Sequence, residues 1–295
     1  RKRTKNSLTD ITIAPSSGFI SYPENMGTIE NKGVELNLSF IPYRDAEKAA
    51  YWIVSVNGSH NRDKLKKISE ALRNMNAVNA EKLKDSPLPR YEEGESMNRI
   101  WVVKSLGIDP ATGEEIFLRR NGNVTGTWDP IDMVACGNTE PRWRGSLNSS
   151  FTYKGFGMNM SFAYKFGGQM YNQTLVDKVE NADLMYNADK RVLDLRWKKK
   201  GDRVKYKKIS PAAEGSKTKA SSRCVMDENT LQMTSLSFSY RMDKTNAKYI
   251  ERWGMNSVNL AFNMEDLFYL SSIKQERGLK YPFARQFSLS LNVAF

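Results

Sequence analysis

The last eleven residues, 285–295, read RQFSLSLNVAF and decide the fold. Large apolar side chains occupy every second position from Phe287 to Phe295, with small or polar residues between them. Because side chains alternate between the two faces of a β-strand, this segment is apolar on one face and polar on the other. About ten alternating residues are needed for a strand to cross a membrane. The segment is therefore predicted to be the closing strand of an outer-membrane barrel.

The same alternation recurs upstream, most clearly in residues 156–167. Six large apolar residues share one parity there, and the residues between them are polar or small: Phe156, Met158, Met160, Phe162, Tyr164 and Phe166. A strand in a soluble core rarely keeps such a row unbroken, whereas lipid on one face requires it. Shorter copies span 34–40 and 258–264, and a weaker one, which Ile53 interrupts, spans 52–56. A change of parity near 234–235 predicts a β-bulge, and we expect about ten antiparallel strands in all.

The connections between the predicted strands fall into two sets. If the last strand ends in the periplasm, the short connections lie on the periplasmic side: 43–49, 108–113, 154–155 and 243–253. The long connections lie on the other side: 14–27, 63–96, 121–141, 169–228 and 265–284. Short periplasmic turns and long extracellular loops are typical of outer-membrane barrels. The prediction is an all-β fold of antiparallel transmembrane strands, part of a larger barrel, whose long extracellular loops carry short helices.

Composition excludes several other classes of protein. Apolar residues make up 40% of the chain, and no run of 18 apolar residues occurs, so a helical membrane protein is excluded. The net charge of +12 suits an anionic membrane surface, an acidic ligand or nucleic acid. The basic run 198–208 is interpreted as a solvated loop, because no nucleic-acid-binding fold accompanies it.

Catalytic chemistry finds little support in the sequence. His60 is the single histidine, and no nucleophile with a base, phosphate-binding loop or metal-ligand spacing is present. We therefore expect neither an enzyme nor a cofactor or metal site. Cys136 and Cys224 are the two cysteines, and the sequence leaves open whether they pair or stay free. The opening segment RKRTKNSLTD has no apolar run typical of a secretion signal, so we expect the start to be missing if the protein is secreted or inserted in the outer membrane.

Several short motifs, in order along the chain, resemble the SusC/RagA-like TonB-dependent transporters of Bacteroidetes. They are NMG at 25–27, NKGVE at 31–35, GIDPATG at 107–113, GN at 137–138 with Pro141, FTYKGF at 151–156, and YP at 281–282 with Phe295. LQM at 231–233 departs from the strand start that is common in the family.

This resemblance implies a barrel of about 22 strands, of which residues 1–295 would be the C-terminal part, without the plug and the N-terminal strands. It also implies uptake of oligosaccharides or peptides across the outer membrane. The implied partners are a SusD-like lipoprotein over the extracellular mouth and the TonB complex, which would act through the absent plug.

Two groups of side chains are candidate binding residues. Aromatic residues at the bases of loops can stack on sugars, although loop packing explains such residues more often: Trp128, Tyr171, Trp197 and Tyr269. Three cations lie on the outward parity at the extracellular ends of their strands: Lys32, Arg62 and Arg285. Near the interface such a cation costs about 0–1 kcal/mol, and it can pair with phosphate. We predict that Lys32 and Arg62 contact outer-membrane glycolipid, with Arg285 a separate, weaker candidate.

Two alternatives stay open at this point. One is a self-contained, passive outer-membrane channel or adhesin that does not use TonB. The other is a soluble all-β binding protein that uses its basic surface.

Overall fold

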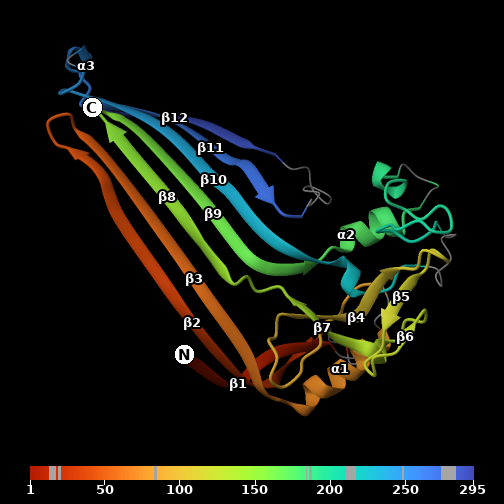
Figure 1. The fold of residues 1–295 in the computed structure, drawn as a ribbon. Helices are drawn as coiled ribbons and strands as arrows, with labels where there is room; N and C mark the ends of the chain where they lie inside the picture. The colour runs from red at the N-terminus through yellow and green to blue at the C-terminus, as the bar shows by residue number, and fades with distance from the viewer. Residues whose placement is uncertain are drawn as a thin grey trace. The chain divides into compact units, whose positions relative to one another are not determined.

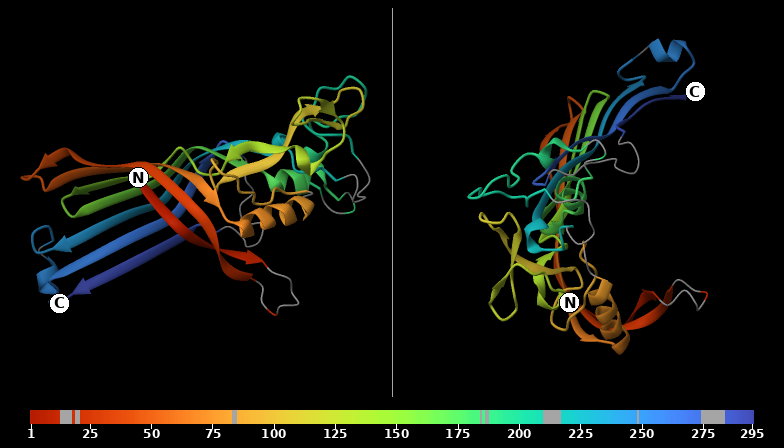
Figure 2. Two further views of the ribbon diagram at one scale, coloured as in Figure 1. Left: turned by 90° about the horizontal axis from the view of Figure 1, so that it is seen from below. Right: turned by 90° about the vertical axis from the view of Figure 1, so that its right-hand side faces the viewer.

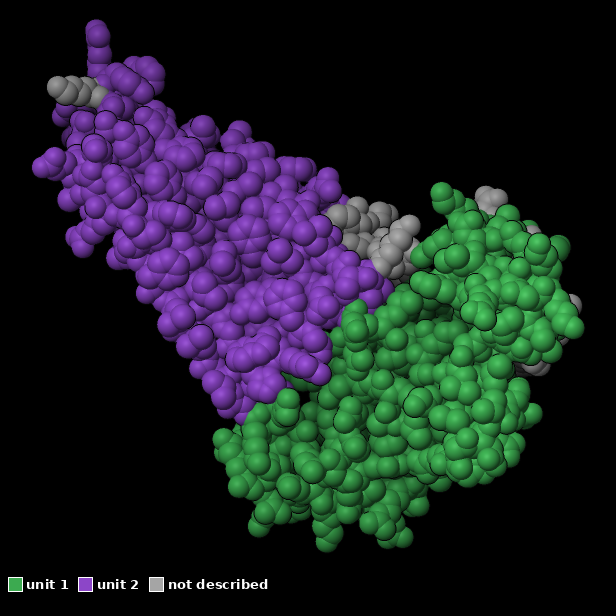
Figure 3. Space-filling model, in the orientation of Figure 1, with its two compact units in different colours: residues 1–32, 62–140, 168–227 green, residues 33–61, 141–167, 228–295 purple. Residues whose placement is uncertain are grey.

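The computed structural model describes residues 1–12, 18, 21–82, 85–183, 185, 188–209, 217–247, 249–273 and 284–295. The YP pair at 281–282 and parts of the predicted loops 14–27, 169–228 and 265–284 lie outside these residues. The chain forms two compact units, coloured separately in Figure 3. Unit 1 contains residues 1–32, 62–140 and 168–227, and unit 2 contains residues 33–61, 141–167 and 228–295.

Eight strands form one sheet in the order β1-β2-β3-β8-β9-β10-β11-β12. Figures 1 and 2 show the last five of these lying side by side. The strands are β1 (Lys2–Thr12), β2 (Ser21–Asp45), β3 (Ala50–Ile68), β8 (Trp143–Tyr153), β9 (Phe156–Tyr171), β10 (Val225–Asp243), β11 (Ser257–Ser271) and β12 (Gln286–Ala294). The antiparallel pairing of the last predicted strand with β11 is confirmed over its whole length.

Local chemistry sets the register of the sheet. The β8–β9 hairpin turns at Lys154 and Gly155, both with positive φ, as a two-residue turn that matches strand twist requires. A Cβ on Gly155 would lie 2.4 Å from the carbonyl oxygen of Arg241, so this position accepts only glycine. The predicted bulge is confirmed, because the β10–β11 register shifts between Met233 and Ser235.

The apolar rows of unit 2 are exposed. Leu289 and Phe295 are 70% and 82% exposed, and the even-numbered row from Val34 to Phe40 on β2 is exposed as well. The opposite face also remains open, since eight of the nine β12 residues are exposed. A soluble sandwich would bury one of these faces against a second layer. The exposed rows therefore favour lipid as the environment of this face and disfavour the soluble alternative.

Two of the expected wall strands lie elsewhere, so within the described residues the large sheet has eight strands instead of about ten. The residues on either side of the turn at 108–113 form β4 (Arg99–Ile108) and β5 (Glu115–Leu118) of a separate sheet. Its order is β6-β5-β4-β7, with β6 (Val124–Thr125) and β7 (Met133–Asn138) arising from a segment predicted to be loop. The hairpin turn itself forms as its sequence predicts, with Asp109 accepting hydrogen bonds from Ala111 and Thr112.

Short and long connections still alternate along the large sheet when β4 to β7 are assigned to the second sheet. β3 pairs directly with β8, so residues 69–142 form one long connection that contains the whole second sheet. Short turns still join β2 to β3, β8 to β9 and β10 to β11, and the last of these carries α3 (Tyr249–Arg252).

The apolar cores of unit 1 lie under its connections. One core is built on β4 by Ile100, Trp101, Val102 and Val103 with Phe117, Met133 and Ala220. A second joins Ile29 and Leu65 to Leu72 of α1 (Glu70–Lys82), a short helix in the long connection that follows β3. The helix is held to the chain that follows it, since the Asn76 side chain donates to the Tyr91 carbonyl and accepts from the Tyr91 amide. Cys136 and Cys224 are both free thiols, so they do not form the disulfide that the sequence left open.

A buried ion network, in place of an apolar core, stabilises the long connection 172–224 where it leads into β10. This connection carries α2 (Gln173–Leu175), η3 (Val176–Glu180), η4 (Lys190–Val192) and η6 (Ser222–Cys224). Arg223 donates to Glu180 at 2.7 Å and to Glu115 at 3.0 Å. The Glu180 side chain is fully buried, and it also accepts from the Thr218 hydroxyl at 2.7 Å. The network therefore ties η3 and η6 to the start of β5.

A second arginine holds the same connection through backbone carbonyls. Arg196 is buried and donates to the carbonyl oxygens of Val192 and Lys207, at 2.6 and 3.1 Å. Such hydrogen bonds from a charged donor stabilise irregular backbone, because they satisfy carbonyl groups that have no partner in a helix or β-ladder.

Among the described residues, no helix is both long and apolar enough to cross a membrane.

The first prediction concerns the two faces of β9 near the centre of its apolar row. Met160→Arg should destabilise the assembled protein by about 2–4 kcal/mol, because it places a cation against lipid. Ser161→Arg, one residue away on the polar face, should cost far less. Urea titration of the full-length protein in lipid vesicles measures both values. Equal costs at the two positions would contradict a lipid-facing row.

The second prediction concerns the buried network. Glu180→Gln should destabilise unit 1 by about 3–5 kcal/mol, because it leaves Arg223 buried with one of its two carboxylate partners. The control is Glu114→Gln, which removes a solvent-exposed ion pair to Lys208 and should have little effect. Hydrogen exchange of the amides in 172–224 reports the difference. Equal protection in both variants would show that the network is dispensable.

The same network predicts a pH dependence. Burial alone would raise the pKa of Glu180, but the hydrogen bonds and charge of Arg223 outweigh it and hold the pKa below its usual value. The stabilisation is therefore fully present above the unfolded carboxyl pKa of about 4.3 and is lost as pH falls toward the lower folded value. Exchange protection of 172–224, corrected for intrinsic rates, should fall in that acidic window, and a loss centred above pH 6 would exclude this carboxylate as the cause.

Candidate functional site

A cleft of about 540 Å³ in unit 1 lies beside the buried network. It lies where β5 faces the end of the long connection, and its lining combines an aromatic edge with charges of both signs. Its charged and aromatic lining residues are Glu114, Glu115, Phe117, Trp128, Lys207, Lys217 and Lys219. This arrangement can hold a ligand that presents both a flat apolar face and an acidic group.

Positive charge at the cleft comes from three lysines, of which Lys207 is buried. Burial lowers the pKa of Lys207, and the nearby Glu180 carboxylate offsets part of that effect. Lys219 forms an ion pair with Asp85 at 3.4 Å, whereas Lys217 is exposed. Because Glu114 and Glu115 line the cleft as well, its surface carries charges of both signs.

Trp128 is the one predicted aromatic residue that lines this cleft. Its indole nitrogen donates to the Ala220 carbonyl at 2.9 Å, and its ring packs on the β4 core. These contacts fix the ring while leaving it on the cleft wall, so it is a rigid stacking surface.

The other three aromatic residues lie elsewhere. Tyr171, at the end of β9, packs against the same core as Trp128. Trp197 donates to the Pro110 carbonyl at 3.0 Å and covers Gly113, where a Cβ would lie 2.5 Å from the indole. Tyr269 lies on β11 in unit 2, opposite Gln232. Packing therefore explains the positions of Tyr171 and Trp197, and ligand contact at these three residues stays a prediction.

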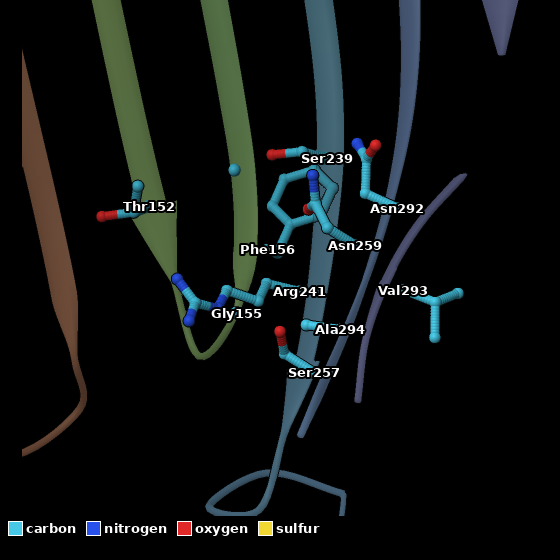
Figure 4. Close-up of a pocket in the computed structure, with 11 residues that line it drawn as sticks. Thr152, Gly155, Phe156, Ser239, Arg241, Ser257, Asn259, Asn292, Val293 and Ala294 are labelled. Atoms are coloured by element: carbon cyan, nitrogen blue, oxygen red, sulfur yellow. The ribbon is translucent and has the colours of Figure 1, made fainter. Parts of the chain in front are cut away.

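A second hollow, of about 560 Å³, lies on unit 2 near its short turns. Figure 4 shows polar side chains of β8, β10, β11 and β12 around it. Arg241, Asn259 and Asn292 stand opposite one another across β10, β11 and β12, so they form one row on the polar face. Gly155 and Gly157 at the β8–β9 turn leave room beside this row. The hollow offers amide and guanidinium groups to a polar protein segment or to water.

The three outward cations predicted from parity are all exposed: Lys32, Arg62 and Arg285. Gly33 lies against His60 and Asn61, which places Lys32 and Arg62 at neighbouring positions of the paired strands β2 and β3. Arg285 precedes β12, which is at the opposite edge of the sheet, so it does not lie beside Lys32 and Arg62.

Sequence reasoning missed the ion network and both hollows. Arg223 lies 43 residues from Glu180 and 108 from Glu115, in segments that have no periodicity. Three features of the sequence marked parts of this region: the Asp109 turn, which is followed directly by Glu114 and Glu115, the residue Trp128, and the basic run 198–208. The polar hollow could have been anticipated, since Arg241, Asn259 and Asn292 all lie on polar parities of predicted strands.

Comparison with curated proteins finds relatives that span the whole chain. TonB-dependent receptor P39 of Formosa agariphila is 23% identical over 359 aligned positions, covering 100% of this chain and 33% of the receptor. TonB-dependent receptor P3 of the same organism is 22% identical over 99% of this chain and 31% of its own length. This chain thus spans about one third of these relatives. No protein-family model matches it.

Solved structures show the same fold. The RagAB peptide importer in its open-open state superposes with a TM-score of 0.73 at 18% identity, over 99% of this chain and 32% of that chain. Its closed-closed state gives a TM-score of 0.73 at 19% identity over the same shares. A structure of the RagAB peptide transporter gives 0.68 at 19% identity, over 92% of this chain and 29% of that chain.

Together the motifs, the antiparallel sheet and these comparisons confirm that the chain is similar to part of a SusC/RagA-like TonB-dependent transporter and has the corresponding β-barrel strands.

Proposed function

We propose that this chain supplies wall strands and extracellular connections to an outer-membrane transporter that imports oligosaccharides or peptides in a TonB-dependent manner. The single observation that carries the proposal is the similarity over the whole chain to TonB-dependent receptors. The exposed apolar rows of unit 2 support the outer-membrane location, because they suit contact with lipid and are not covered by a second layer of protein in the described residues.

The proposed partners follow from the family resemblance. A plug encoded outside these residues would couple the barrel to the TonB complex, and a SusD-like lipoprotein would cover the extracellular mouth. The polar row Arg241–Asn259–Asn292 lies on the face that would line the lumen, where it would contact water or a polar segment of the plug. Among substrate classes, peptide is favoured by the solved neighbours, which are described as peptide importers.

The unit 1 cleft is the part of this chain that we assign to contact with cargo or with the lipoprotein. Trp128 offers a fixed ring and Lys207, Lys217 and Lys219 offer positive charge, so an acidic peptide or an acidic sugar fits best. Tyr171, Trp197 and Tyr269 remain weaker candidates for the same role.

The structure suggests a precise excision that tests this assignment. The Thr218 amide donates to the Asn181 side chain at 2.8 Å, so residues 182–217 can be replaced by a short Gly-Ser linker. The excision keeps Arg223 with Glu180 and Glu115, but it removes Lys207 and Lys217 from the cleft. In the full-length transporter, we expect normal assembly, measured by heat-modifiable migration in gels, and loss of growth on a peptide digest or glycan panel.

The control inserts the same linker after Gly122, an exposed turn, and should leave growth unchanged. Normal growth after the excision would contradict the functional role of the connection. Uptake that continues after deletion of the TonB complex would instead support the passive channel. A full-length protein that purifies without detergent would support the soluble alternative.

A further inference from the structure

Unit 1 carries a concentrated basic surface on strands β1, β2 and β3, which are neighbours in the sheet (Figure 1). Seven exposed cations share one face of these strands: Arg1, Arg3, Lys5, Lys32, Arg62, Lys64 and Lys66. We call these residues the basic patch. From residues 1–5, 28–32 and 62–66, the carboxylates are Glu30 and Asp63, and Asp63 points to the other face, where it accepts from the Met97 amide.

The register and the ion pairs place the patch on one face. Arg3 stands opposite Glu30 and Lys5 stands opposite Thr28 in the β1–β2 pair. Opposed residues in antiparallel strands point to the same side. Arg1, Lys32 and Lys66 reach the Glu30 carboxylate at 2.5, 3.4 and 4.0 Å. Arg62 and Lys64 follow the parity of Lys66 along β3.

Glu30 organises the patch without neutralising it. The residue is only 3% exposed, because cationic side chains cover it from both neighbouring strands. One carboxylate holds three cations in place and leaves six positive charges of the seven uncompensated within the patch. Fixed cations with an excess of charge are well suited to bind a further anion.

The other face of the same strands is already occupied. Ile29 and Leu65 alternate with the cations and are buried against Leu72 of α1. The basic patch is therefore the outer face of this part of the sheet, on the side away from the α1 core. Along β2, the residues of the same parity that follow Lys32 are Val34, Leu36, Leu38 and Phe40, all exposed and apolar.

The geometry points to a phosphorylated lipid headgroup as the ligand of the basic patch, held in the leaflet at the end of the sheet from which the long connections leave. An apolar row that is followed along the strand by cations matches acyl chains that are followed by phosphate. The guanidinium group of arginine can donate two parallel hydrogen bonds to phosphate oxygens. Outward-facing cations also cost little free energy when they lie near the membrane interface. This inference rests on the proposed membrane location, although not on TonB dependence or on the cargo.

The test uses the full-length transporter purified in detergent and titrated with phosphorylated lipid A or with the same lipid after dephosphorylation. Native mass spectrometry counts bound lipid. Lys32→Glu with Arg62→Glu should weaken binding of phosphorylated lipid A by about tenfold or more, since charge-assisted contacts are replaced by repulsion. The control is Lys2→Glu with Lys67→Glu, which changes the same charge at positions of the alternate parity on β1 and β3 and should bind normally.

Each remaining outcome supports or contradicts a phosphorylated lipid headgroup as the ligand of the basic patch. Equal binding of dephosphorylated lipid A would show that only the acyl chains are recognised, and an equal loss in the control would reduce the effect to net charge. Full competition by inorganic phosphate at the same concentration would assign the patch to a free anion. If the glutamate variant fails to assemble, Lys32→Gln with Arg62→Gln should still show reduced binding. Uptake is expected to persist in all variants, so its loss would bear on the proposed function instead.

Discussion

The alternation of two faces along hydrogen-bonded strands is the constraint on which this structure depends. In lipid, each backbone amide and carbonyl must find a partner within the protein, and a sheet does this strand by strand. One face can then be wholly apolar while the other stays polar, as the opposed positions of β11 and β12 show. An unbroken row such as Phe156 to Phe166 is explained by this constraint and by no requirement of a soluble core. The bulge at Met233–Ser235 and the turn at Lys154–Gly155 are the local adjustments that keep the parity correct.

Away from that sheet, unit 1 is stabilised in a different way. Its connections have few long apolar segments, so small cores around β4 and α1 are supplemented by buried charge. Arg223 joins carboxylates from two distant segments, and Arg196 satisfies carbonyls of irregular backbone. A buried ion pair of this kind specifies one arrangement of its partners, because loss of either partner leaves an uncompensated charge. That specificity keeps Trp128 and the lysines on one cleft.

Strand periodicity made most of the large sheet predictable from sequence, together with its turns, its bulge and the order of short and long connections. The prediction failed at 97–120, where a good hairpin sequence was assigned to the wall. A hairpin motif specifies its own turn but not the sheet that it joins, and the aromatic and β-branched residues of Ile100 to Val103 suit a soluble core equally well. The ion network could not be predicted, since its members are brought together only by tertiary folding. The basic patch was half predictable: parity marked Lys32 and Arg62, but Glu30 and the β1 cations emerged only once the β1–β2 register was known.

The central claim is that alternate residues of one sheet face lipid and an aqueous lumen. Nitroxide labels placed one at a time from Met158 to Ala163, in the full-length protein in vesicles, test this most directly. Power-saturation spectroscopy compares collision with oxygen, which concentrates in lipid, and with a water-soluble nickel complex. The account predicts oxygen accessibility at 158, 160 and 162 and nickel accessibility at 159, 161 and 163. Uniform accessibility along the six positions would contradict it.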